Sequence, residues 1–142
     1  MKNIDEMDVR ILNLLKMNAR ISLKDLSSEV HLTAPALSAR ISKLETAGFI
    51  KGYHADVDLE KIGYKIKAFV QISVLPEDQR KFYDFIQKKD FILECNHITG
   101  PFSMLLKVVT PTTSELDTFI GELQEFGRTE TQVVFSTVLE RF

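Results

Sequence analysis

Two short helical patterns, separated by only a few residues around positions 25–52, limit most strongly what this chain can fold into. The first apolar stripe consists of Leu23, Leu26 and Val30, and the second consists of Leu37, Ile41 and Leu44. Spacings of three and four residues place each stripe on one face of a helix. Because only His31 and Leu32 connect the two patterns, the helices are expected to cross steeply, as in a helix-turn-helix.

Residues that favour helix ends flank both patterns. Ser22 is a predicted N-cap of the first helix, with Asp25 in the capping-box position three residues later. Thr33 is a predicted N-cap of the second helix, and Pro35 falls in its first turn, where a missing N–H removes no hydrogen bond. Gly48 follows as a C-cap signal, so the second helix is expected to occupy residues 33–46.

The face of the second helix opposite its apolar stripe is small and rich in hydroxyl groups. It consists of Pro35, Ser38, Ala39, Ser42, Lys43 and Thr46. A face with little bulk and no acid can enter the major groove of DNA and hydrogen-bond to bases or phosphates. Arg40 lies at the flank, where it would reach a phosphate or, alternatively, form a structural ion pair with Glu29 or Glu45. The competing interpretation is an ordinary helical hairpin with a solvated outer face.

Basic residues are concentrated around this segment, although the whole chain has a net charge of −2. Residues 10–52 contain seven basic side chains and three acidic ones, an excess of four positive charges. A local basic surface is what contact with phosphates requires, and Arg20 and Lys24 are further phosphate candidates. The excess is small, so affinity per subunit is expected to be moderate and strongly salt-dependent, which favours a dimer.

The rest of the N-terminal half completes a small domain. Residues 5–18 form a predicted helix with a broad apolar stripe and with Asp5, Glu6 and Asp8 at the positive end of its dipole. Residues 49–58 mix apolar and polar side chains around a glycine, which is typical of a short strand pair or wing. We therefore predict a winged helix-turn-helix domain at residues 1–58, followed by a hinge at residues 59–65 that contains Gly63.

Beyond the hinge, the spacing of apolar residues changes from the helical period to the alternation typical of strands. Predicted strands occupy residues 66–74, 91–99, 102–109 and 131–139, and predicted helices occupy residues 77–89 and a segment that Ser114 caps. The phenylalanines at 82, 85, 119 and 126 are expected to lie in the core that these strands and helices form. The order β-α-β-β-α-β predicts a ferredoxin-like domain at residues 66–142, so the chain belongs to the α+β class. Both helices would cover one face of the sheet, and a second subunit packing sheet to sheet would cover the other.

Composition excludes several classes of protein. With 142 residues the chain fits one domain or two small ones, each with a modest core that oligomerisation would supplement. No apolar run approaches a membrane helix, and the charged N-terminus lacks the apolar segment of a signal peptide. The single Cys95 excludes an internal disulfide. These features predict a cytoplasmic protein without a membrane partner.

No group of residues predicts catalysis or a cofactor. Cys95 and His97 lie two apart and would share a strand face, which makes a Cys–His nucleophile pair conceivable, although two ordinary strand residues are the favoured interpretation. A metal site would need more ligands, and His31 and His54 fall in the other domain. We expect no enzyme activity, no metal and no cofactor.

The chain resembles the Lrp/AsnC (leucine-responsive/asparagine-regulator) family of prokaryotic transcription factors over nearly its whole length. The residues that carry the resemblance are Asp5, Asp8, Ile11, Leu12, Leu15, Asn18, Ala19, Arg20, Leu26, Ser27, Leu32, Thr33, Arg40, Leu44, Glu45, Gly48, Phe49, Ile50, Gly52, Tyr53, Leu59, Gly63, Thr99, Gly100, Leu105, Leu106, Lys107 and Val108. The resemblance implies a dimer held by the C-terminal domains, often assembled into tetramers or octamers. It also implies DNA binding by residues 33–46 and an amino-acid effector site between C-terminal domains, near the turn after the second strand.

That turn departs from the family pattern. Thr99 is followed by Gly100-Pro101-Phe102-Ser103, where amino-acid-responsive members usually carry Gly-Asp-Tyr-Asp. The ammonium of an amino acid needs an acceptor in a partly dry site, and here only backbone carbonyls or Ser103 remain. Pro101 also lacks an N–H for a carboxylate. The departure predicts altered effector chemistry, with another ligand or none.

The leading hypothesis is a sequence-specific DNA-binding transcriptional regulator, whose dimer places two recognition helices about 34 Å apart. The DNA-contact candidates are Arg20, Ser22, Lys24, Thr33, Pro35, Ser38, Arg40, Ser42 and Lys43. One alternative is a nucleoid-associated architectural protein that wraps double-stranded DNA with low sequence specificity. Another is a metabolite-binding protein or a regulatory subunit of an enzyme, which the intact three-helix unit argues against.

Overall fold

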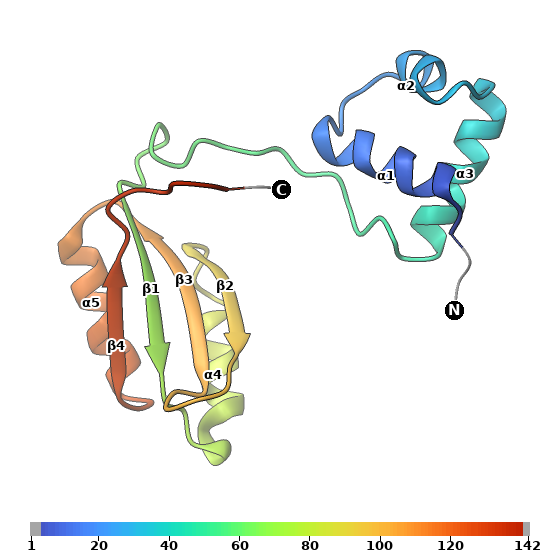
Figure 1. Cartoon of the computed structure of the whole chain (residues 1–142). Helices are drawn as coiled ribbons and strands as arrows, with labels where there is room; N and C mark the ends of the chain where they lie inside the picture. The colour runs from blue at the N-terminus through green and yellow to red at the C-terminus, as the bar shows by residue number, and fades with distance from the viewer. Residues whose placement is uncertain (1–3, 141–142) are drawn as a thin grey trace. The chain divides into compact units, whose positions relative to one another are not determined.

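The computed structural model describes residues 4–140, which divide into two compact units (Figure 1). One unit contains the described residues up to Asp56 together with Glu140, and the second is Val57–Leu139. The first three and last two residues, which the predicted domains 1–58 and 66–142 include, lie outside the described part. No helix of the described part is long and apolar enough to cross a lipid bilayer.

The N-terminal unit consists of three helices around one small core. They are α1 (Glu6–Met17), α2 (Leu23–Val30) and α3 (Ala34–Thr46). The core residues are Ile11, Leu26, Val30, Leu37 and Leu44, all essentially inaccessible to solvent. The two predicted apolar stripes are thus confirmed except at Leu23, which is exposed because it lies in the first turn of α2.

Side-chain caps begin both α2 and α3, and one left-handed residue makes the tight turn between the two helices. The Ser22 hydroxyl accepts a hydrogen bond from the Asp25 N–H at 3.0 Å, and Thr33 Oγ1 accepts one from the Ala36 N–H at 3.4 Å. His31 ends α2 with a φ of 55°, which reverses the chain within a few residues. The caps predicted at Ser22 and Thr33 are therefore confirmed.

The predicted wing is wrong. Residues 50–58 contain neither helix nor strand, and the first strand of the described chain starts at Ile66. A wing requires two strands that pair with each other, whereas this segment makes a single pass. Its Tyr53 hydroxyl donates a hydrogen bond to Glu45 Oε1 at 2.8 Å, which ties the segment to the last turn of α3 instead.

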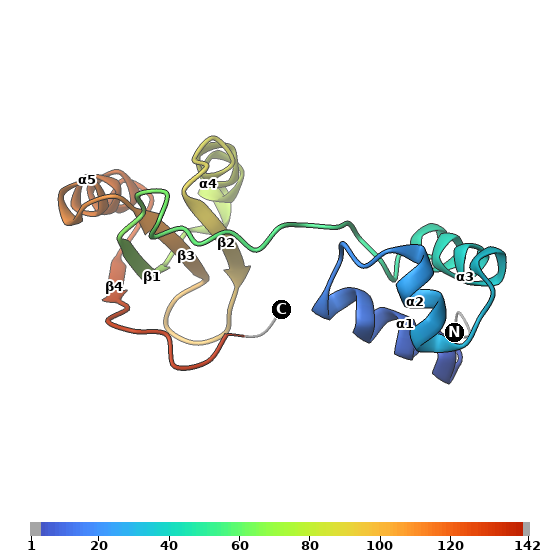
Figure 2. The ribbon, with the colours of Figure 1, turned by 90° about the horizontal axis from the view of Figure 1, so that it is seen from above.

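The second unit is an antiparallel sheet with two helices on one face (Figure 2). Its elements are β1 (Ile66–Ile72), the 3-10 turn η1 (Pro76–Asp78), α4 (Gln79–Ile86), β2 (Ile92–His97), β3 (Met104–Thr110), α5 (Thr113–Gln124) and β4 (Thr129–Val133). The strand order is β2-β3-β1-β4, and every neighbouring pair is antiparallel. The predicted ferredoxin-like topology is confirmed.

Aromatic side chains fill the layer between the sheet and its helices. Phe82 and Phe119 are fully buried, and Phe85 and Phe126 pack against the same cluster. The ring centroids of Phe82 and Phe126 lie 5.6 Å apart, in an edge-on arrangement. The prediction that these phenylalanines form core is confirmed.

Three predicted boundaries shift. Thr112, rather than Ser114, caps α5, because its side chain accepts the Glu115 N–H. The predicted helix at residues 77–89 is shorter and begins after a 3-10 turn. The last strand ends at Val133 rather than continuing to residue 139, because the register with β1 stops at the Ala68–Val133 pair.

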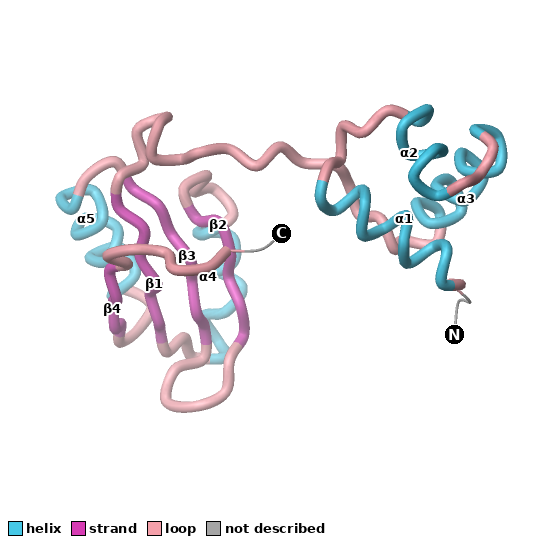
Figure 3. Tube along the Cα trace, turned by 45° about the horizontal axis from the view of Figure 1, so that its top comes forward, coloured by secondary structure: helices cyan, strands magenta, loops and turns pink. Residues whose placement is uncertain are grey.

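Residues 134–139, here called the tail, cross the face of the sheet that carries no helix (Figure 3). The Val134 N–H donates to the Lys67 carbonyl at 2.8 Å, and Lys67 Nζ donates to Thr137 Oγ1 at 3.0 Å. Despite these bonds, Phe135 and Val138 are almost completely exposed, at 101% and 96%. The tail thus presents large apolar groups to solvent.

Candidate nucleic-acid interface

The outer face of α3 is exposed as the helical projection predicts. Pro35, Ser38, Ala39, Ser42, Lys43 and Thr46 are all exposed, whereas Leu37 and Leu44 are buried. The exposed set is short, carries three hydroxyl groups and contains no acid. Its shape and chemistry therefore suit close approach to a groove lined by bases and phosphates.

The candidates outside the outer face of α3 lie near the starts of α2 and α3. Arg20, Ser22, Lys24 and Thr33 are exposed. The Ser22 hydroxyl donates to Asp25 Oδ2 at 2.6 Å in addition to its capping bond, so its hydrogen-bonding capacity serves the helix end. Ser22 and Thr33 therefore fix helix termini, while the exposed Arg20 and Lys24 supply positive charge nearby.

The predicted ion-pair partners of Arg40 require a correction. Its Nη1 lies 2.7 Å from Asp5 Oδ2 and 2.6 Å from Asp8 Oδ1, so its guanidinium joins α3 to the start of α1. The alternative ion pair was expected with Glu29 or Glu45, and both of those partners are wrong. Arg40 is best described as a positioning residue for α3, because its charge is already engaged by two carboxylates.

Asp5 and Asp8 also form the N-terminal cap of α1. The Asp8 N–H donates to Asp5 Oδ1 at 2.8 Å, and the Asp5 N–H donates to Asp8 Oδ2 at 3.2 Å. The hydrogen bond from the Asp8 N–H and the adjacent Arg40 lower the pKa of Asp5 below its usual value. From the sequence, these acids were predicted only to interact with the positive end of the helix dipole. Their i, i+3 spacing is also typical of a capping box.

Two further contacts fix the surroundings of α3. Arg10 Nη2 donates to the Glu29 carbonyl at 2.7 Å, which links α1 to the end of α2. Burial, followed by the hydrogen bond to Glu45, raises the pKa of Tyr53 to about 12. Tyr53 is therefore a neutral hydrogen-bond donor at every physiological pH.

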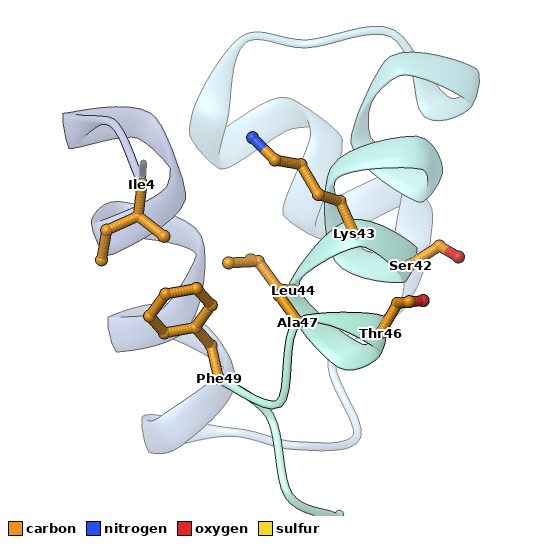
Figure 4. A pocket seen from close by; sticks show the side chains of 7 residues that line it. All are labelled: Ile4, Ser42, Lys43, Leu44, Thr46, Ala47 and Phe49. Atoms are coloured by element: carbon orange, nitrogen blue, oxygen red, sulfur yellow. The ribbon is translucent and has the colours of Figure 1, made fainter. Parts of the chain in front are cut away.

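An apolar pocket of about 570 Å³ lies between the start of α1 and the end of α3 (Figure 4). Ile4, Leu44 and Phe49 are the large apolar side chains of its lining, and Ser42 and Thr46 line it from α3. Lys43 is the charged residue of its lining. The pocket therefore adjoins the hydroxyl-rich face and shares Ser42, Lys43 and Thr46 with it.

The candidate effector turn is closely bonded to the end of β1. Ser103 Oγ accepts the Val74 N–H at 2.9 Å and lies 3.3 Å from the Ile72 carbonyl, while the Ser73 hydroxyl donates to the Pro101 carbonyl at 3.0 Å. Phe102 is buried, with the Arg128 guanidinium 4.9 Å from its ring centre. The hydroxyl of Ser103, expected as a possible ligand acceptor, therefore takes part in hydrogen bonds within the domain.

Cys95 and His97 share a strand face, since their partners on β3 are the core-facing Leu106 and Met104. Burial raises the pKa of the Cys95 thiol, which disfavours the reactive thiolate. Among residues 4–140 no cluster of three or more His, Cys, Asp or Glu side chains suits a metal ion.

The N-terminal unit is a DNA-binding helix-turn-helix, and the second unit is an α+β ligand-binding domain. Residues 4–45 match the model of the AsnC-type helix-turn-helix domain, and residues 67–142 match that of the Lrp/AsnC ligand binding domain. The chain belongs to the Lrp/AsnC family of transcriptional regulators.

Individual relatives extend over both units. The transcriptional regulator LrpC of Bacillus subtilis is 30% identical over 95% of this chain and 94% of its own length. Its solved structure matches with a TM-score of 0.93, at 29% identity, covering 98% of this chain and 99% of that one. The leucine-responsive regulatory protein of Escherichia coli is 33% identical over 96% of this chain and 88% of its own. A regulator from Neisseria meningitidis, solved as a complex with L-Met, shares the fold with a TM-score of 0.92 at 23% identity, covering 98% and 94%.

Removing the Asp8 carboxylate tests whether the Arg40 ion pair holds α3 in place. Asp8 is 1% exposed, so Asp8→Ala leaves the guanidinium without its buried partner and removes half of the capping box. We expect the free energy of unfolding of the N-terminal unit to fall by about 2–3 kcal/mol. Urea unfolding followed by circular dichroism measures it. Glu6→Gln, an exposed acid in the same helical turn, is the control and should change stability by less than about 0.5 kcal/mol; equal effects of the two variants would contradict the role of the ion pair.

Proposed function

We propose that this regulator reads double-stranded DNA with the outer face of α3, acting in the cytoplasm as a sequence-specific dimer. The observation that carries the proposal is the exposed, acid-free face of α3 on a helix that Arg40 fixes to α1. In this arrangement Ser38 and Ser42 approach base edges, and Pro35 allows the helix start to come close to the backbone. Arg20, Lys24 and Lys43 contribute charge to phosphates, and Ser22 and Thr33 present capped helix starts.

Lys43→Ala tests the proposed phosphate contact. Loss of one such contact should weaken binding to target and random DNA alike and lower the slope of log K against log salt by about 0.9. Fluorescence anisotropy at several salt concentrations measures both quantities. Lys88→Ala removes the same charge from an exposed position in the second unit and should leave the slope unchanged. A Lys43→Ala slope equal to that of the parent protein would refute the assigned surface.

We further propose that a second copy of the chain covers the helix-free face of the sheet and the tail. Leu139 is exposed together with Phe135 and Val138, and exposed apolar groups of this size mark protein–protein surfaces. A two-fold dimer built there would also supply two recognition helices, which the modest positive charge of one helix-turn-helix calls for. Larger assemblies, tetramers or octamers, would build on such dimers.

Polar substitutions in the tail test this dimer. Replacing Phe135 and Val138 together by Ser should shift the sedimentation coefficient towards the monomer, because two large side chains leave the interface. Leu75→Ser also removes an exposed apolar side chain, outside the tail, and serves as the control. An unchanged assembly in the Phe135/Val138 variant would exclude the tail from the interface.

We propose that an amino acid or other small metabolite acts as effector near Thr99, Gly100 and Pro101. The L-Met complex of the Neisseria meningitidis regulator shows that a protein of this fold accommodates an amino acid. Here Ser103 and Phe102 are engaged within the domain, so backbone carbonyls of the turn are the groups that would accept an ammonium.

A panel of the twenty amino acids in thermal unfolding tests the effector. A ligand that binds only the folded state adds about 2.7 kcal/mol at 100 times its Kd, so at least one amino acid should raise Tm visibly. Gly100→Leu should abolish that rise by placing a side chain in the turn. Gly63→Leu introduces the same strain, since the two glycines have φ values of +113° and +108° and open space around them, and should keep the rise. A flat panel with the parent protein would rule out an amino-acid effector.

A further inference from the structure

A second cavity, of about 350 Å³, opens in the ferredoxin-like unit where the chain enters β1. Its walls include Tyr64, Lys89, Phe91, Glu115, Phe119 and Glu122. These residues come from the segment before β1, the connection between α4 and β2, and α5. The volume lies within the range of pockets that hold one small molecule.

One wall of this cavity already holds an ammonium group against aromatic rings. Lys89 Nζ lies 4.8 Å from the centre of the Phe85 ring and 6.0 Å from that of Phe91, while it pairs with Glu122 Oε2 at 2.5 Å. Phe91 is fixed edge-on to the buried Phe119, with ring centres 4.9 Å apart. The cavity thus combines rigid aromatic surface with carboxylate, which is the chemistry that binds organic cations.

The second carboxylate of the lining is that of Glu115, which forms no ion pair within residues 4–140. The Glu115 backbone N–H donates a hydrogen bond to Thr112 Oγ1, the cap of α5, and this bond leaves its side-chain carboxylate unengaged. Because Glu122 is already matched by Lys89, the lining carries one uncompensated negative charge. An anion would be repelled by that charge, and a free amino acid would place its carboxylate near the same group.

We propose that this cavity binds a primary amine with a short apolar body. The ammonium would pair with Glu115, and the apolar part would lie on Phe91 and Phe119. Tyr64 stands two residues before β1, at the end of the hinge, so a bound amine would contact the hinge directly. The cavity is at the end of β1 where Ile66 starts, whereas the turn that contains Ser103 bonds to the other end of β1 (Figure 1).

Binding of phenethylamine and of 1,4-diaminobutane to the full chain, measured by calorimetry, tests the proposal, with phenylacetate as the anionic counterpart of the first amine. We expect at least one amine to bind and phenylacetate not to bind. Glu115→Gln should weaken the amine about tenfold, because a charge-assisted hydrogen bond becomes a neutral one. In methyl NMR spectra, the amine should shift the signals of the cavity residues Thr110 and Thr118.

Asp117→Asn is the matched control, because it removes one exposed carboxylate from α5 outside the cavity lining and should leave amine affinity unchanged. Circular dichroism melting of both variants verifies that they fold. The proposal is overturned if neither amine binds at millimolar concentration, or if Glu115→Gln and Asp117→Asn bind the amine as the parent does. It is equally overturned if the amine shifts signals only around residues 99–103, which would assign it to the effector turn.

Discussion

The contact between Arg40 and the two acids at the start of α1 determines how α3 is presented. Arg40 lies on the helix that carries the exposed hydroxyl face, while Asp5 and Asp8 cap another helix, so one guanidinium fixes the position of α3 relative to α1. The Asp8 carboxylate is almost wholly buried, and its desolvation is offset by the capping hydrogen bond and the ion pair together. A small apolar core alone would leave the rotation of α3 about its axis less well determined.

In the second unit, the two ends of β1 differ in how closely their surroundings are bonded. At the far end of the strand, Ser103 and Ser73 join the turn to the sheet, and Gly127 must be glycine because a Cβ there would lie 1.9 Å from the Ser73 carbonyl oxygen. At the near end, a cavity remains beside Tyr64. The end that resembles the effector site of the family is therefore closely bonded, and the end beside the hinge has room for a ligand.

Most helices and strands could be predicted from the sequence because their signals are local. Apolar spacing, the Ser22 and Thr33 caps and the alternation in β1 each depend on neighbouring residues, and all three are confirmed. The prediction of a wing was wrong because residues 49–58 have a mixed apolar and polar pattern. Whether two strands pair depends on their partners, which a local pattern does not specify. The predicted ion-pair partners of Arg40 were wrong for the same reason, since Asp5 and Asp8 lie 35 and 32 residues away in the chain.

Coupling between a ligand and DNA requires an element that a ligand can bias. The described fold provides such an element in the segment that ends at Tyr64, because the bonds that hold this segment are local. The Tyr64 N–H donates to the Leu59 carbonyl, the Gly63 N–H donates to that of Glu60, and Lys61 bonds to Asp58. A ligand beside Tyr64 would act on this segment directly, whereas a ligand at residues 99–101 would act on it through the length of β1 or through the assembly. Two sites at opposite ends of one strand would then allow two metabolites of different charge to act on the same hinge.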